Sequence, residues 1–114
     1  MNSILTSVKK FLGIGEDYTH FDPDIVMHIN SAFFVLNQLG VGPESPFTIE
    51  DKSSVWSDFV GDGKIELVRT YVYLFVRRIF DPPTNSAHLS ALNEQIKEYE
   101  WRMNVQVDPG TESE

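Results

Sequence analysis

The chain contains no cysteine among its 114 residues. This absence excludes disulfide scaffolds, cysteine-ligated zinc sites and thiol catalysis, and it suits a reducing compartment. Basic residues are also scarce, because nine Lys and Arg stand against seventeen Asp and Glu, for a formal net charge of −8. Such a balance argues against a broad phosphate-binding surface, which requires clustered cations.

Long hydrophobic runs are missing as well. The longest one, Tyr71–Val76, is far shorter than the roughly 20 residues that a membrane-spanning helix needs. Near the N-terminus the basic pair Lys9-Lys10 follows the apolar residues, whereas a secretory signal has the reverse order and a longer apolar stretch. We therefore expect a protein without a membrane segment that is made in the cytoplasm.

Helical periodicity dominates the rest of the chain, whose 41% hydrophobic and 23% charged residues are typical of one globular domain. In four segments the apolar residues recur at the spacing of a helix face. A fourth helix begins at Thr84, Asn85 or Ser86 and keeps its apolar seam to Met103. The three earlier helices cover residues 4–12, 22–39 and 64–80.

Local signals mark where these helices start and stop. Asp22 can cap the second helix, with Pro23 in its first turn. Phe34 and Val35 widen its apolar surface, which predicts neighbours on two sides. Asp81-Pro82-Pro83 stops the third helix, and the short link that follows predicts an antiparallel hairpin with the fourth. We predict an all-α bundle of about four helices over residues 1–106, followed by a flexible acidic tail, 107–114.

The connection Val41–Gly63 is unusually long for a compact domain, and loops of this length are commonly functional or disordered. Its apolar residues, among them Phe47 and Trp56, make simple disorder a poor explanation. Residues 54–60 predict a helical turn or two, and residues 47–49 a short extended piece.

No arrangement of residues points to catalysis, a metal or a cofactor. His20, His28 and His88 are the only histidines, and none has a partner at i+3 or i+4 that would make a metal site. The neighbouring carboxylates are explained by helix capping and by solvated helix faces. We therefore expect a protein that is not an enzyme and that has no catalytic, cofactor-binding or metal-binding residues.

Candidate interface residues remain. Arg69, Tyr73 and Arg77 follow one another at i, i+4 and i+8 and form a basic-aromatic stripe on the third helix. Either this stripe pairs with the domain's own acidic side chains, or it receives an acidic surface of a neighbouring subunit. Residues 64–80 are the only segment with a positive net charge, since they contain four Lys or Arg and one Glu.

Three aromatic side chains can be interpreted in the same two ways, as packed within the domain or as contacts for a partner. Trp101 points roughly 200° around the fourth helix from Tyr99, so it either folds back on the domain or anchors an interface. For Trp56 and Phe59, packing under the long connection is favoured over contact with a partner. The candidate interface therefore consists of Trp56, Phe59, Arg69, Tyr73, Arg77 and Trp101.

Several short stretches, taken in order, resemble a known family. They are Asp17-Tyr-Thr-His-Phe-Asp-Pro-Asp, Leu36-Asn-Gln-Leu-Gly-Val-Gly-Pro, Tyr71-Val-Tyr-Leu, Phe80-Asp-Pro-Pro and Glu100-Trp-Arg. The chain is similar, over roughly residues 2 to 106, to the small head–tail connector proteins of tailed bacteriophages, also called head-completion or adaptor proteins.

This resemblance implies a small helical bundle that assembles as a homo-oligomeric ring, commonly a dodecamer, beneath the portal protein at the head–tail junction of the virion. The ring extends the channel for genomic DNA, which passes without sequence-specific binding, and offers a surface to the next connector or tail-completion protein. An acidic subunit suits such a channel because it repels phosphates. Two alternatives stay open: a DNA-packaging accessory that acts transiently with terminase or portal, and a cytoplasmic helical regulator.

Overall fold

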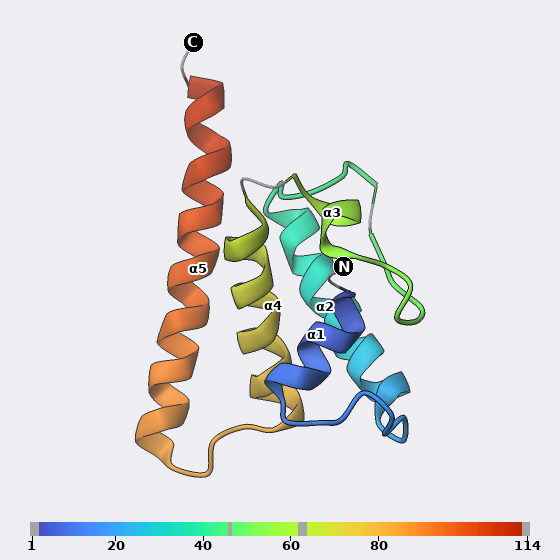
Figure 1. Cartoon of the computed structure of the whole chain (residues 1–114). Helices are drawn as coiled ribbons and strands as arrows, with labels where there is room; N and C mark the ends of the chain where they lie inside the picture. The colour runs from blue at the N-terminus through green and yellow to red at the C-terminus, as the bar shows by residue number, and fades with distance from the viewer. Residues whose placement is uncertain (1–2, 46, 62–63, 113–114) are drawn as a thin grey trace.

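The computed structural model of the chain describes residues 3–45, 47–61 and 64–112, with side chains up to Asn104. These residues form five helices (Figure 1): α1 (Ile4–Phe11), α2 (Asp22–Gln38), α3 (Trp56–Phe59), α4 (Ile65–Phe80) and α5 (Ser86–Glu112). The described ranges contain no strand, only an isolated bridge between Ser3 and Val55. The prediction of an all-α fold is therefore confirmed, and the fifth helix is the short turn α3.

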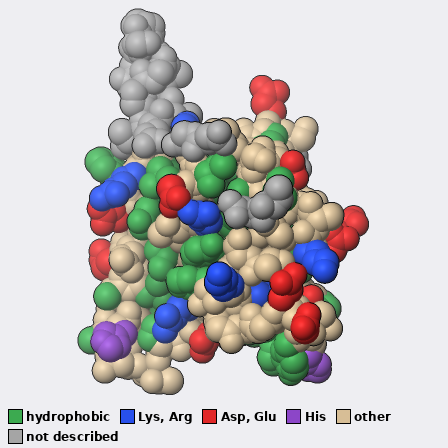
Figure 2. All heavy atoms as spheres, in the orientation of Figure 1, with side chains coloured by type: hydrophobic (Ala, Val, Ile, Leu, Met, Phe, Trp, Pro, Cys, Tyr) green, Lys and Arg blue, Asp and Glu red, His purple; other side chains and the backbone are tan. Residues whose placement is uncertain are grey.

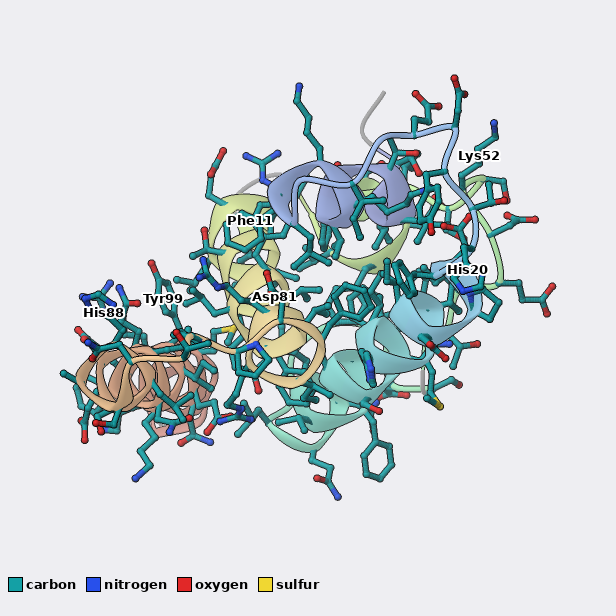
Figure 3. All side chains as sticks on the ribbon, turned by 90° about the horizontal axis from the view of Figure 1, so that it is seen from below. Phe11, His20, Lys52, Asp81, His88 and Tyr99 are labelled. Carbon is teal, nitrogen blue, oxygen red and sulfur yellow. The ribbon has the colours of Figure 1, made fainter. Side chains whose placement is uncertain are left out.

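Helix α4 is the centre of the molecule. It lies between α2 and α5, and α1 and α3 cover α4 on one side (Figures 1 and 3). α4 and α5 run in opposite directions, which confirms the hairpin predicted from Asp81-Pro82-Pro83. The buried side chains of α4 are Val68, Tyr71, Val72, Phe75 and Val76.

A buried ion pair connects α1 with the start of α2. The Nζ atom of Lys9, a residue only 3% exposed, lies 2.9 Å from Oδ1 of Asp22 and donates a hydrogen bond to the carbonyl oxygen of Glu16 at 3.0 Å. The prediction that Asp22 caps α2 is wrong. Phe21 holds the N-cap position without a side-chain bond, and the Asp22 carboxylate serves the tertiary contact with Lys9 instead.

The long connection between α2 and α4 is held to the core by specific contacts. The side-chain amide of Asn30 accepts from the Ile49 N–H at 2.8 Å and donates to the Ile49 carbonyl at 3.1 Å. No strand forms at the predicted extended piece, residues 47–49, because this side chain takes the place of a partner strand. The helical turn predicted within residues 54–60 is confirmed as α3.

One glycine of this connection allows a close approach. Gly42 has φ +91°, and a Cβ atom there would lie 2.5 Å from the ring of Phe59. Phe59, which is 3% exposed, packs in turn on Phe33 with 4.5 Å between ring centroids. Any side chain at position 42 would therefore displace part of the aromatic core.

Helix α5 continues to Glu112 and extends past the rest of the molecule at its C-terminal end (Figure 1). The predicted flexible tail, residues 107–114, thus begins as helix in its described part, and its last two residues lie outside the described residues. Each residue added to a nucleated helix gains one backbone hydrogen bond, except Pro109, which has no N–H to donate.

A side-chain bond joins α4 to α5. The hydroxyl of buried Tyr71 donates to the Glu100 carboxylate at 2.7 Å. Burial and this hydrogen bond both raise the pKa of Tyr71 above its ordinary value of 10. The proton of Tyr71 is therefore part of the α4–α5 contact.

We predict that Gly42→Ala lowers the free energy of unfolding by about 2–4 kcal/mol, because it adds overpacking against Phe59 to left-handed backbone strain. Gly13→Ala is the matched control, since Gly13 also has positive φ (+82°) but no atom within 4 Å of the added Cβ. It should cost about 1–2 kcal/mol. Equal losses in equilibrium denaturation would contradict the contact with Phe59.

A second prediction concerns alkaline pH. Above about pH 10 the unfolded state releases the Tyr71 proton while the folded state retains it, so the free energy of unfolding should fall, by up to about 1.4 kcal/mol per pH unit for one proton. Tyr71→Phe should make this decline shallower, whereas Tyr18→Phe, at an exposed position, should leave it unchanged. Denaturation curves between pH 8 and 11 measure the slopes, and identical slopes for wild type and Tyr71→Phe would refute the assignment.

Candidate interaction surfaces

Two of the six predicted interface residues lie in the core. Trp56 and Phe59 are 1% and 3% exposed. The Trp56 indole N–H donates to the Ser7 hydroxyl at 3.4 Å, and its ring meets Phe33 edge-on. Both side chains thus pack under the connection between α2 and α4 and present almost no surface to a partner in this conformation.

The stripe on α4 has three different environments. Arg69 is half-buried and pairs with Glu66 one turn earlier, at 2.5 Å. Tyr73 stacks on Phe11 of α1, with 4.7 Å between centroids and 14° between ring planes, and burial raises the pKa of Tyr73. Arg77 is exposed, and no carboxylate of the described residues forms an ion pair with it. Arg77 is therefore the member of the stripe that is open to a partner.

A hollow of about 310 Å³ lies beside Arg77. It exists because α1 is short and covers the seam between α2 and α4, whereas the seam between α4 and α5 stays open on the same side (Figure 3). We call it the α4 groove. Its lining includes Phe11, Leu74, Arg77, Pro83, His88 and Ala91.

The α4 groove is apolar in its walls and positively charged at its edge. Figure 2 shows hydrophobic side chains gathered between α5 and α1, with Lys and Arg side chains among them. Phe11 and His88 stand on the same side of the molecule, on α1 and α5 (Figure 3). Phe11 is 41% exposed although it is a phenylalanine. Such a combination suits an aromatic or aliphatic side chain next to a carboxylate.

Trp101 is the most exposed large hydrophobic residue among those described, at 66%. Ile96 and Met103 of the same helix are buried, and Trp101 lies on the side of α5 opposite to them. It does not fold back on its own domain. Beside it, Arg102 pairs with Glu98 at 2.8 Å and lies 5.7 Å from the centroid of Tyr99.

Other surface features escaped the sequence prediction. Met27 and Phe34 of α2 are each 56% exposed, so the second side of α2, which the sequence predicts to be covered, is open in the single chain. Phe11 and His88 also lie at the surface, in the α4 groove. The available signal was the position of Phe34 outside the core stripe, and Phe11 gave none, since it follows the apolar stripe of α1.

Two features are absent from the residues that the structure describes, a metal-binding cluster and a membrane-spanning helix. These residues contain no group of three or more His, Asp or Glu that could hold a metal ion. Within the same residues, no helix combines the length and the apolar character that crossing a membrane requires.

The structure thus describes a small helical subunit with a concave surface, the α4 groove, and an aromatic side chain projecting from α5. The family model described as "Phage connector protein" matches residues 4–110. Neither the curated proteins nor the solved structures include a match. The chain belongs to the phage connector protein family, which confirms the resemblance. Its general role is that of a structural head–tail connector, a virion component that contacts other head or tail proteins.

Proposed function

We propose that copies of this chain form a ring, most simply a dodecamer, under the portal protein at the head–tail junction. The ring extends the DNA channel and presents a docking surface to the next connector or tail-completion protein. The observation that carries this proposal is the family match over residues 4–110. Genomic DNA passes through such a ring without sequence-specific binding, and the net charge of −8 supports sliding because like charges repel.

Within this assembly, the α4 groove receives an acidic surface of an adjoining component. Arg77 supports this assignment because it is exposed beside an apolar hollow and has no ion-pair partner among the described residues. Arg69 contributes less, since Glu66 already neutralises it. A cation without a partner in its own chain can pair with a carboxylate across the contact, which speeds encounter and fixes the register of docking.

The alternative, a DNA-packaging accessory, is favoured by one feature, the net positive charge of residues 64–80. The two roles differ in how they bind duplex DNA. An accessory that grips DNA binds it with an affinity that falls steeply with salt. A channel subunit of this charge has no such affinity, and filter binding or anisotropy at low salt distinguishes the two.

We predict that purified virions contain the protein at the head–tail junction, and that deleting its gene yields unjoined heads and tails. Mass spectrometry of virions and electron microscopy of the deletion lysate measure these outcomes. The connector proposal would be contradicted by virions that lack the protein, or by infectious joined particles produced when its gene is deleted.

We predict further that Arg77→Glu lowers the yield of joined particles about tenfold or more, because a repelled carboxylate at a docked contact costs at least about 1.4 kcal/mol. The variant should unfold at the same denaturant concentration as wild type, since Arg77 is exposed. Lys52→Glu is the matched control, as Lys52 is an exposed cation far along the chain from the α4 groove. Normal joining with Arg77→Glu would remove the groove from the interface.

A further inference from the structure

Trp101 and the α4 groove are complementary surfaces, and both are exposed in the single chain. Trp101 is 66% exposed, although a tryptophan side chain gains more than most from burial. The α4 groove is a hollow of about 310 Å³ whose walls include the half-exposed ring of Phe11. Each surface has what the other needs: one is an aromatic projection, and the other is an apolar recess.

The chemistry of the groove suits an indole ring in particular. The guanidinium of Arg77 at its edge can lie over an aromatic face, and such cation–π contacts are strongest with tryptophan. Phe11 and Leu74 supply apolar walls, and Phe11 can also meet a second ring edge-on. An aliphatic side chain would use the walls of the groove but would not use Arg77.

The charges beside the two surfaces are complementary. Glu94 and Glu98 precede Trp101 by seven and three residues and therefore share its face of α5. Arg77 supplies the positive charge at the groove, and His88 beside it offers a ring N–H that can donate to a carboxylate. Glu98 is paired with Arg102, but that pair is exposed on both sides, so exchanging partners costs little. Lys97 lies on the other flank of Trp101 from Glu98.

Trp101 cannot reach the groove of its own chain. Gln95, the lining residue nearest to Trp101 on α5, is six residues earlier, or about 9 Å along the axis and about 120° around the helix from Trp101. Moreover, Trp101 points away from α4 whereas the groove lies against it. The occupant must therefore come from another molecule, and a second copy of this chain provides an aromatic side chain with two carboxylates, Glu94 and Glu98, on one flank.

We infer that Trp101 of one copy inserts into the α4 groove of the next, with Glu94 and Glu98 facing Arg77 and His88. The two surfaces differ, so the contact is head-to-tail and each copy keeps one free groove and one free Trp101 for further copies. Repeated contacts of this kind close into a ring or grow as a filament. This inference rests on the proposed function, since it names the contact between copies that the ring requires.

Disulfide trapping tests the contact directly, because the chain has no cysteine of its own. We predict that the double variant Ala91→Cys, Lys97→Cys, which keeps Trp101 and places a cysteine one turn before it on the same face of α5, forms a ladder of covalent multimers after mild oxidation. Both positions are exposed, so the fold should persist. Within one chain the two sulfurs cannot join, since disulfides need Cα atoms about 4.4–6.8 Å apart. Non-reducing electrophoresis reads the ladder, both for the concentrated full chain and for purified virions.

Controls separate this contact from others. Ser90→Cys, Lys97→Cys is the matched pair, because Ser90 is exposed one residue from Ala91 but on a different face of α5. It should give at most about a tenth of the multimers. Dimers from Lys97→Cys alone would reveal a symmetric contact and would overturn the inference, as would a ladder of equal strength from the Ser90 pair.

Failure of this contact and failure of the connector role give different results. Virions that contain the protein but yield no Ala91–Lys97 ladder, when the concentrated chain yields none either, would overturn the contact alone. Virions without the protein would overturn the proposed function, whatever the ladder of the concentrated chain. A ladder in both samples, lost when Arg77→Glu is added to the double variant, is the result expected.

Discussion

The burial of α4 is the constraint on which the rest of the structure depends. Its residues Val68, Val72 and Val76 are at most 1% exposed, because α2, α5 and the pair α1 and α3 surround it. A helix that is apolar over most of its circumference needs such neighbours. The chain supplies cover for all but one side of α4, and that remaining side contains Arg77 and the α4 groove. The open surface is thus a consequence of the packing.

The same packing explains how an acidic protein keeps a basic helix. Residues 64–80 carry four Lys or Arg in a chain of net charge −8, yet only Arg69 of these forms an ion pair within the described residues, and it does so with Glu66 of its own helix. The acidic side chains of α5 that share the face of Trp101 project away from α4. Within the described residues of one chain, no ion pair therefore forms between the basic residues of α4 and the acidic residues of α5. The two sets of charges lie on separate faces, so they can attract each other between two chains.

The apolar periodicity and the residues that start or stop helices were sufficient to predict the helices. The repeat of apolar residues located α2 and α4, and Asp81-Pro82-Pro83 predicted the hairpin with α5, because these signals act over one or two turns. Contacts between segments that are distant in the sequence could not be predicted from it. The Lys9–Asp22 pair and the Asn30–Ile49 bonds depend on which elements meet in space. For this reason the sequence wrongly predicts that Asp22 caps α2 and that both sides of α2 are covered.

The two tryptophans show where sequence reasoning stops. Trp56 follows a β-branched residue, Val55, and Trp101 follows an acidic one, Glu100. From the sequence, each tryptophan could either pack within its own domain or contact a partner. Trp56 is 1% exposed and Trp101 is 66% exposed, because α3 lies against α4 whereas α5 has α4 on one side and open surface on the other. Helix α5 packs on α4 at the edge of the bundle, and no other described helix covers its second side. For a member of a connector family, that uncovered side is where contacts with other molecules can form at the least cost to the fold.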